Sequence, residues 1–489
     1  MNATDKTYRL LIGGQWVDGA NGTVDVMNPA TETVVGRAPE ASVAQAEEAA
    51  RAAAEAFPTW WRTPPAERAR LLQAVADRLR ERQADLVPLI ISETGATAQV
   101  GSRMQVPVAI ERFERYARSA ARSLDIPLPP SPMPATPLAA GGLIGGVVQR
   151  QPVGVVACIS PYNFPVVNMA GKIAPALAVG CTVVMKPAPQ DPLAVIELAE
   201  IMHEVGFPPG VVNIITSTKP EPAAALTTSR HVDMVSFTGS TGVGVRIMEA
   251  GAATMKRQLL ELGGKGAALV LADADVKKAV GALQSVWAFH SGQICTAPTR
   301  AVVHRSRYDE LVSALGAVAP HLKVGDPLEM DTLVGPVISA VQRDRIEGYI
   351  ATGANEGAEV VVDGRRPSHM ERGYYVGPTL LAGCRPDMTP VREEIFGPVI
   401  VVVPFDDEDE GLAIANGGDF GLYDYVFSED SDRAYRVARQ MRSGNVGINT
   451  AQRNHEAPFG GFKMSGVGRD GGDFGLLCYT EMQSIVWPG

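Results

Sequence analysis

The chain has 489 residues, of which 46% are hydrophobic and 20% are charged. This length exceeds the roughly 250 to 300 residues at which a single core stops growing, so we expect a globular protein with more than one domain. The net charge of −10 disfavours nucleic acid and anionic membranes as the main partners, and no stretch is long and apolar enough to predict a membrane span.

The N-terminus and the cysteines favour a cytoplasmic protein without a metal site. The first residues lack the basic and then apolar pattern of a secretory signal. The five cysteines are scattered singly, which argues against a disulfide framework and a structural zinc site. The histidines show no spacing that is typical of metal ligands.

The N-terminal third predicts a hairpin followed by helices. Residues 10–19 carry apolar residues on both sides of a Gly-Gly turn, which is typical of a β-hairpin. Ser42 has the spacing of a capping box and begins a helical pattern that we expect to end at Pro58. Pro65 is expected to begin another helix, which Pro88 should break or restart. A proline-rich and glycine-rich stretch at residues 126–146 then predicts an extended connector.

Two later regions alternate short apolar strands with helices, the pattern of parallel α/β sheets. Helices are expected to begin near Pro165, Pro192 and Pro220. Ligands bind such sheets at the carboxyl ends of the strands, so the residues that follow each strand are candidates for function. The expected strands are Val153–Ile159, Thr182–Met185, Val211–Ile215 and Val232–Phe237 in the first region, and Ala301–His304, Glu359–Val362 and Val399–Val403 in the second.

A carboxylate and a thiol stand at glycine-flanked turns between these regions. Glu261 opens the sequence Glu-Leu-Gly-Gly-Lys, and Cys295 closes the sequence Gly-Gln-Ile-Cys. A thiolate is a strong nucleophile, and a carboxylate beside a water molecule can act as a general base. The pair therefore suggests covalent catalysis followed by hydrolysis.

These two motifs resemble those of the aldehyde dehydrogenase superfamily, in its non-acylating, NAD(P)-dependent branch. The resemblance implies that Cys295 is the nucleophile and Glu261 the base. It also assigns the oxyanion hole to Asn163, in the sequence Pro-Tyr-Asn-Phe-Pro, together with the Cys295 backbone N–H. The implied reaction oxidises an aldehyde to a carboxylic acid through a cysteine thiohemiacetal and a thioester.

The resemblance also implies a fold: a Rossmann-like cofactor domain, an α/β catalytic domain and a small β arm for oligomerisation. The cofactor domain would comprise residues 1–126 and 148–260, the catalytic domain residues 261–450, and the arm and tail residues 127–147 and 451–489. The arm would join a homodimer or homotetramer, whereas the alternative interpretation of the connector is a loose linker. Two other functions stay open: a CoA-acylating semialdehyde dehydrogenase, and a catalytically silent binding or structural protein on the same fold.

The implied cofactor is NAD or NADP. Pro189 stands where NAD-preferring members usually place a Glu that binds the adenosine ribose, and Lys219 is placed to approach a 2′-phosphate, so we expect NADP to be tolerated. The other cofactor-binding residues that the resemblance implies are Ile159, Ser160, Lys186, Gly239, Ser240, Val243, Leu262, Glu394 and Phe396.

The resemblance places four residues along the aldehyde tunnel. Asn168 and Gly171 replace the larger Met and Trp of many members, which predicts a wider and more polar tunnel with aromatic walls at Tyr162 and Phe459. We therefore expect an uncharged aldehyde that is bulky or aromatic. No arginine is placed by a motif to bind a substrate carboxylate, but a loop arginine such as Arg453 is left open for that role.

Overall fold

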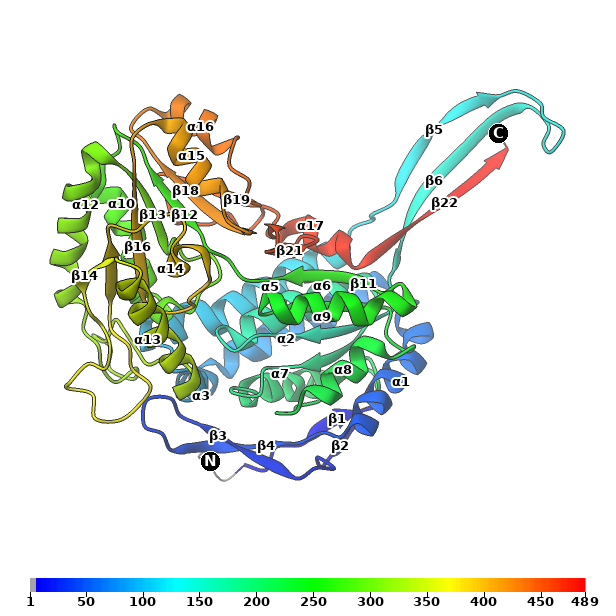
Figure 1. The fold of residues 1–489 in the computed structure, drawn as a ribbon. Coiled ribbons are helices and arrows are strands. Elements are labelled where there is room, and N and C mark those ends of the chain that lie inside the picture. Colours follow the sequence, from blue (N-terminus) through cyan, green and yellow to red (C-terminus); the bar gives the residue numbers. More distant parts are fainter. Residues whose placement is uncertain (1–5, 489) are drawn as a thin grey trace.

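The computed structural model describes residues 6–488 and contains two α/β halves and an extended arm (Figure 1). The first half is built on an eight-stranded sheet in the order β2-β1-β9-β8-β7-β10-β11-β21. Its centre is parallel, as the alternation of strands and helices predicted. The strands are β1 (Leu10–Ile12), β2 (Gln15–Val17), β7 (Val155–Ile159), β8 (Thr182–Lys186), β9 (Val212–Ile214), β10 (Met234–Thr238), β11 (Arg257–Glu261) and β21 (Gly466–Val467).

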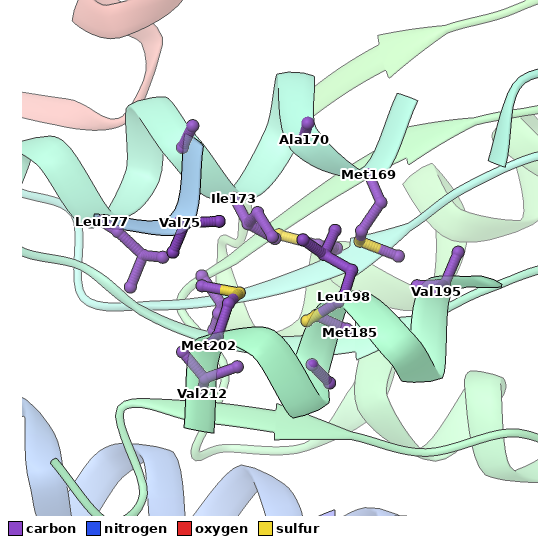
Figure 2. Packing of buried hydrophobic residues seen from close by; sticks show 14 of the residues in the cluster. Val75, Met169, Ala170, Ile173, Leu177, Met185, Val195, Leu198, Met202 and Val212 are labelled. Carbon is purple, nitrogen blue, oxygen red and sulfur yellow. The ribbon is translucent and has the colours of Figure 1, made fainter. Parts of the chain in front are cut away.

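Helices bury both faces of this sheet. Side chains alternate along the strands, so Val155 and Ala157 face one hydrophobic cluster while Val156 and Cys158 face another. Figure 2 shows part of the second cluster, where α2, α6 and α7 pack on β8 and β9. The helical segments of this half are α1 (Val43–Trp60), α2 (Pro65–Glu81), α3 (Gln83–Thr94), α4 (Ala98–Val100), η2 (Gly101–Gln105), α5 (Val106–Ala120), α6 (Pro165–Val179), α7 (Leu193–Glu204), α8 (Pro220–Thr228), α9 (Thr241–Gly251) and η3 (Ala252–Thr254).

Prolines begin helices as expected but do not end them. Pro65, Pro165 and Pro220 each occupy the first position of a helix, where a missing N–H removes no hydrogen bond. The prediction that Pro58 ends α1 was wrong, because Pro58 lies in the last turn and the helix continues to the buried Trp60. Pro88 lies inside α3, and the chain breaks earlier, between α2 and α3.

The second half holds a seven-stranded sheet in the order β14-β15-β16-β13-β12-β18-β19, with helices on both sides (Figure 1). Its strands are β12 (Ala267–Val270), β13 (Arg300–His304), β14 (Glu359–Val362), β15 (Thr379–Ala382), β16 (Val399–Phe405), β18 (Tyr423–Phe427) and β19 (Asn445–Ile448). Its helical segments are α10 (Val276–Leu283), α11 (Ser285–Ala288), η4 (His290–Gly292), α12 (Arg305–Val318), η5 (Ala319–His321), α13 (Ala340–Asn355), α14 (Thr389–Arg392), α15 (Glu408–Asn416) and α16 (Ser431–Ala438).

The proline-rich connector forms two strands of an arm that projects from the body (Figure 1). β5 (Ile126–Met133) and β22 (Thr480–Pro488) pair with the two sides of β6 (Gly142–Pro152). The boundary that we expected at residue 148, between the arm and the cofactor domain, falls inside β6. The arm exposes large apolar side chains at Ile126, Met133, Leu143, Val486 and Trp487.

The C-terminal segment, residues 451–488, contributes to both the first sheet and the arm. β21 joins the first sheet beside β11, α17 (Gly472–Cys478) follows it, and only β22 extends into the arm. Two small pairs complete the fold: β3 (Thr23–Met27) with β4 (Val34–Pro39), and β17 (Phe420–Gly421) with β20 (Phe462–Lys463). Among the helices of residues 6–488, none is long and apolar enough to cross a membrane.

Candidate active site

Cys295 lies in the loop between η4 and β13, and its neighbours hold this loop firmly. Gln293 is fully buried, accepts a hydrogen bond from the Ile338 backbone N–H (3.0 Å) and donates to the His290 carbonyl (3.3 Å). Gly292 has a φ of +72°, and a Cβ there would lie 2.1 Å from the Gly397 carbonyl oxygen, so only glycine fits. The local sequence therefore presents the thiol from a rigid turn.

Asn163 lies against the same loop. Its Nδ2 donates to the Gln293 carbonyl (2.7 Å), and its Oδ1 accepts from the Phe164 backbone N–H (3.1 Å). A side-chain amide carries two N–H groups, and this is the only hydrogen bond that Nδ2 donates within residues 6–488. The second N–H therefore has no acceptor among these residues.

Glu261 ends β11 and has an exposed fraction of only 3%. Neither of its carboxylate oxygens has a hydrogen-bond partner among residues 6–488. Burial, and next the negative charge of Asp470, raises the pKa of Glu261 well above its usual value, against the positive charges of Lys172 and Arg469. An unpaired buried carboxylate is costly to keep and is well suited to accept a proton.

The thiol and the carboxylate motifs touch through the backbone. Gly264 lies against Cys295, where an added Cβ would be 2.4 Å from the Cys295 carbonyl oxygen. Burial raises the pKa of the half-buried Cys295 thiol to about 12, and Arg453 is the foremost charge that opposes this rise. The thiol is therefore protonated at neutral pH until another positive charge approaches it.

A pocket of about 390 Å³ opens between the two halves of the chain. Ser240 caps α9 without a side-chain hydrogen bond, and Gly242 faces open space, since a Cβ there would meet nothing within 4 Å. Free N–H groups at such a helix start favour a phosphate group. The lining residues are Ser240, Thr241, Gly242, Arg345, Tyr349, Asp387, Thr389, Arg392, Glu393, Glu394, Asp419 and Phe420.

Two of the expected cofactor residues, Ser240 and Glu394, line this pocket, and Phe396 follows Glu394 in the chain. Glu394 Oε1 accepts a hydrogen bond from the Gly264 backbone N–H (2.8 Å), which ties it to the Glu261 motif. Phe396 has a φ of +58° and packs edge-on against Tyr162, with ring centroids 5.9 Å apart. Tyr162, expected along the aldehyde tunnel, thus contacts a residue that we assigned to the cofactor.

Other expected cofactor residues line the ends of the first sheet. The buried Oγ of Ser160 has no partner within residues 6–488, and Gly239 follows β10. Ile159, Val243 and Leu262 belong to one apolar cluster beneath α9. Leu262 occupies the space above Gly244, where a Cβ would lie 2.6 Å from Leu262 Cδ2.

Lys186 ends β8 beside these residues, paired with Ile159 of β7, and its side chain has acidic neighbours that the sequence did not reveal. Burial lowers the pKa of Lys186 to about 8, against the negative charges of Glu40 and Asp191. Glu40 accepts hydrogen bonds from the Thr218 backbone N–H (2.8 Å) and Oγ1 (3.0 Å). Lys219 is the next residue along the chain and is exposed. No motif or spacing marks Glu40, because it comes from the segment that precedes α1.

The expected tunnel is not widened at Gly171. A Cβ at Gly171 would lie 1.6 Å from Arg112 Nη1, so the Arg112 guanidinium fills the space that a larger residue would occupy. Asn168 Nδ2 lies 3.5 Å from Asn163 Oδ1, next to the oxyanion candidate. At Phe459, the Arg453 guanidinium lies 4.0 Å from the ring centroid. Arg112 therefore occupies the space in which a wider tunnel is predicted at Gly171, and the polarity of the tunnel stays a prediction.

Comparison with known proteins places this architecture in one family. The model of the Aldehyde dehydrogenase family matches residues 16–485. The chain is 38% identical over 486 residues to the 3-succinoylsemialdehyde-pyridine dehydrogenase of Pseudomonas sp, an alignment that covers 98% of this chain and 99% of that protein. It is 39% identical over 484 residues to DhaS of Bacillus subtilis (strain 168), which is also named as an aldehyde dehydrogenase; this alignment covers 98% of the chain and 95% of DhaS.

A solved structure shows the same fold. The crystal structure of betaine aldehyde dehydrogenase from Staphylococcus aureus, in complex with NAD+, superposes with a TM-score of 0.94 at 35% sequence identity. The superposition covers 99% of this chain and 95% of that structure. The match of the family model over nearly the whole length, together with these relatives, shows that the chain belongs to the aldehyde dehydrogenase family.

Proposed function

We propose that the protein oxidises an aldehyde to the carboxylic acid, with NAD+ or NADP+ as the electron acceptor. The observation that carries this proposal is the contact between the two catalytic motifs: Gly264 packs on the Cys295 carbonyl, and Asn163 is hydrogen-bonded to the residue two positions before Cys295. These contacts support a site that combines a nucleophile, an oxyanion donor and a buried base.

The residues around the pocket between the two halves of the chain fit a dinucleotide. The start of α9 and the open space at Gly242 suit a pyrophosphate, and the half-buried Glu394 suits a ribose hydroxyl. The NAD+ complex of the staphylococcal relative supports this assignment. When bound, the oxidised nicotinamide supplies an acceptor for a hydride and a positive charge that favours the Cys295 thiolate.

The Cys295 thiol first loses its proton to solvent, and the thiolate then adds to the aldehyde carbon, which converts the carbonyl oxygen to an oxyanion. The Asn163 Nδ2–H and the Cys295 backbone N–H stabilise this oxyanion. The C–H bond then breaks, its electron pair leaves as the hydride, and the carbonyl re-forms as a thioester on Cys295.

Glu261 completes the cycle. It removes a proton from water, the resulting hydroxide adds to the thioester carbon, and the C–S bond breaks to release the acid and the thiolate. Lys172 supports the charged form of Glu261, because its positive charge lowers the pKa of that carboxyl group against Asp470. The unpaired Glu261 favours hydrolysis over transfer of the acyl group to CoA.

We also infer that NADP+ is accepted alongside NAD+. Pro189 contributes no carboxylate that would repel a 2′-phosphate, and Lys219 is exposed beside Thr218. The arm supports assembly as a homodimer or homotetramer, since its apolar side chains are exposed in the single chain.

The proposal is tested by mixing the protein with benzaldehyde and each cofactor, without CoA. We expect reduced cofactor to form at 340 nm in a one-to-one ratio with benzoate, measured by chromatography. Reduction that requires CoA and yields the acyl-CoA would show instead the acylating activity. Absence of reduction with both aromatic and aliphatic aldehydes would favour a silent binding protein.

A further inference from the structure

Arg453 stands at the wall of a second pocket close to the catalytic loop. This pocket has a volume of about 220 Å³ and contains Tyr423, Gln452 and Phe459 in its lining along with Arg453. Tyr423 stacks on Tyr425 with ring centroids 4.9 Å apart, and the Tyr425 hydroxyl donates to the Thr296 carbonyl (2.7 Å). The pocket wall is therefore connected to the residue that follows Cys295.

Arg453 has no salt-bridge partner in the part of the chain that the structure describes. No carboxylate oxygen within residues 6–488 lies within 4.0 Å of its guanidinium nitrogens. Two neighbouring arginines differ in this respect: Arg115 pairs with Glu456 and with Asp473, at 3.3 Å from the latter, and Arg112 lies 3.7 Å from an Asp470 oxygen. The positive charge of Arg453 is therefore available to pair with an anionic ligand.

The position of Arg453 relative to Phe459 leaves its donors available. At 4.0 Å from the ring centroid, the guanidinium contacts the aromatic face, and a guanidinium that stacks in this way keeps N–H groups free at its edge. These N–H groups form a fork that matches a carboxylate. An aromatic or extended aldehyde that packs on Phe459 would bring its far end to this fork.

The field of Arg453 also reaches the reacting groups. Its positive charge lowers the pKa of Cys295 and the pKa of Glu261, against the effect of burial. Burial lowers the pKa of the neighbouring His455, and Arg453 and Arg112 lower it further, against Glu111. His455 is therefore neutral at pH 7 and does not compete with Arg453 for an anion.

We infer, building on the proposed function, that the physiological aldehyde carries a carboxylate at the end opposite its aldehyde group, and that Arg453 binds this carboxylate. Arg112 forms the neighbouring wall over Gly171, where Asp470 compensates its charge. This inference replaces the earlier expectation of an uncharged substrate and keeps the expectation of an aromatic or bulky one. Arg453 is then a specificity-determining residue.

The test compares 4-carboxybenzaldehyde with its methyl ester, methyl 4-formylbenzoate, which has the same ring and no charge. We expect kcat/KM to be about ten- to a hundredfold higher for the carboxylate, because a hydrogen bond to a charged group contributes that much discrimination. This preference should shrink with added salt, since Arg453 is exposed. In Arg453→Gln the ratio should fall to near one, and in Arg453→Lys it should be intermediate.

Arg439→Gln serves as the matched control, because Arg439 is also exposed but follows α16, outside the lining of the pocket. It should keep the full preference. Circular dichroism and gel-filtration elution check that each variant is folded. Equal oxidation of the two aldehydes by the parent protein, or an equal loss of both activities in Arg453→Gln, would overturn the inference while the proposed function stands. Failure of the parent protein to oxidise either aldehyde or benzaldehyde would instead contradict the proposed function.

Discussion

Gly264 lies so close to Cys295 that a Cβ on the glycine would be 2.4 Å from the cysteine carbonyl oxygen. The Gly264 backbone N–H also donates to Glu394 Oε1 (2.8 Å). One glycine therefore couples the Glu261 motif, the Cys295 loop and Glu394. The three segments are far apart in the sequence but are in contact in the folded chain.

Substitution of Gly264 by alanine is expected to move the Cys295 loop. Forcing a methyl group into a packed contact costs about 1 to 3 kcal/mol, so kcat/KM should fall roughly ten- to a hundredfold. Gly281→Ala is the control, because Gly281 lies in helix α10 and a Cβ there meets nothing within 4 Å. That variant should be as active as the parent and slightly more stable in thermal unfolding. Full activity of Gly264→Ala would show that the Cys295 loop can shift to accommodate a methyl group without loss of activity.

Replacement of Glu261 by glutamine should separate the two halves of the reaction. Removal of the base leaves hydride transfer intact but slows hydrolysis of the thioester by about a hundredfold or more. Stopped-flow measurements at 340 nm should show a burst of one equivalent of reduced cofactor per site, followed by slow turnover. Glu249→Gln, an exposed residue on α9, should turn over normally. Steady turnover without a burst in Glu261→Gln would remove Glu261 from the role of base.

The pH dependence of turnover should follow the charges around Glu261. Burial and Asp470 raise the pKa of Glu261, and only the deprotonated form activates water, so the deacylation rate should rise with pH through that pKa. Asp470→Asn removes a negative charge and should shift the rising limb of the kcat profile to lower pH, by about one unit.

Lys172→Met should have the opposite effect. It removes a positive charge and should shift the rising limb of the kcat profile to higher pH. Both profiles are measured by kcat under saturating aldehyde and cofactor. Shifts in the same direction for the two variants would mean that the rising limb of the kcat profile does not reflect the titration of Glu261.

The cofactor preference depends on the segment around Pro189 and Lys219. We expect kcat/KM values for NADP+ and NAD+ to be comparable, and a hundredfold or larger preference for NAD+ would contradict this. Pro189→Glu introduces a carboxylate that repels a 2′-phosphate and should shift the ratio toward NAD+ by about tenfold. Lys219→Ala should weaken NADP+ alone, whereas an equal loss with both cofactors would indicate a general effect on the loop.

Features set by local rules could be predicted from the sequence. The alternation of apolar strands and helices predicted the parallel sheets, and Ser42 forms the expected capping box with Gln45. The hairpin at residues 10–19 is confirmed as β1 and β2. Glu261 and Cys295 were recognisable because each belongs to a short motif whose glycines the backbone requires. The local pattern did not predict the end of α1 correctly. The helix continues past Pro58, because the packing of the buried Trp60 outweighs the hydrogen bond that the proline cannot donate.

The family, the order of the elements and the candidate nucleophile and base could be identified from the sequence, because they depend on residues that are neighbours in the chain. Three contacts became visible in the folded chain: Arg112 covers Gly171, Glu40 lies near Lys186, and Arg453 stacks on Phe459 without an acidic partner in residues 6–488. These contacts bring together side chains from separate segments, and packing of whole elements, rather than any local periodicity, sets which of them meet.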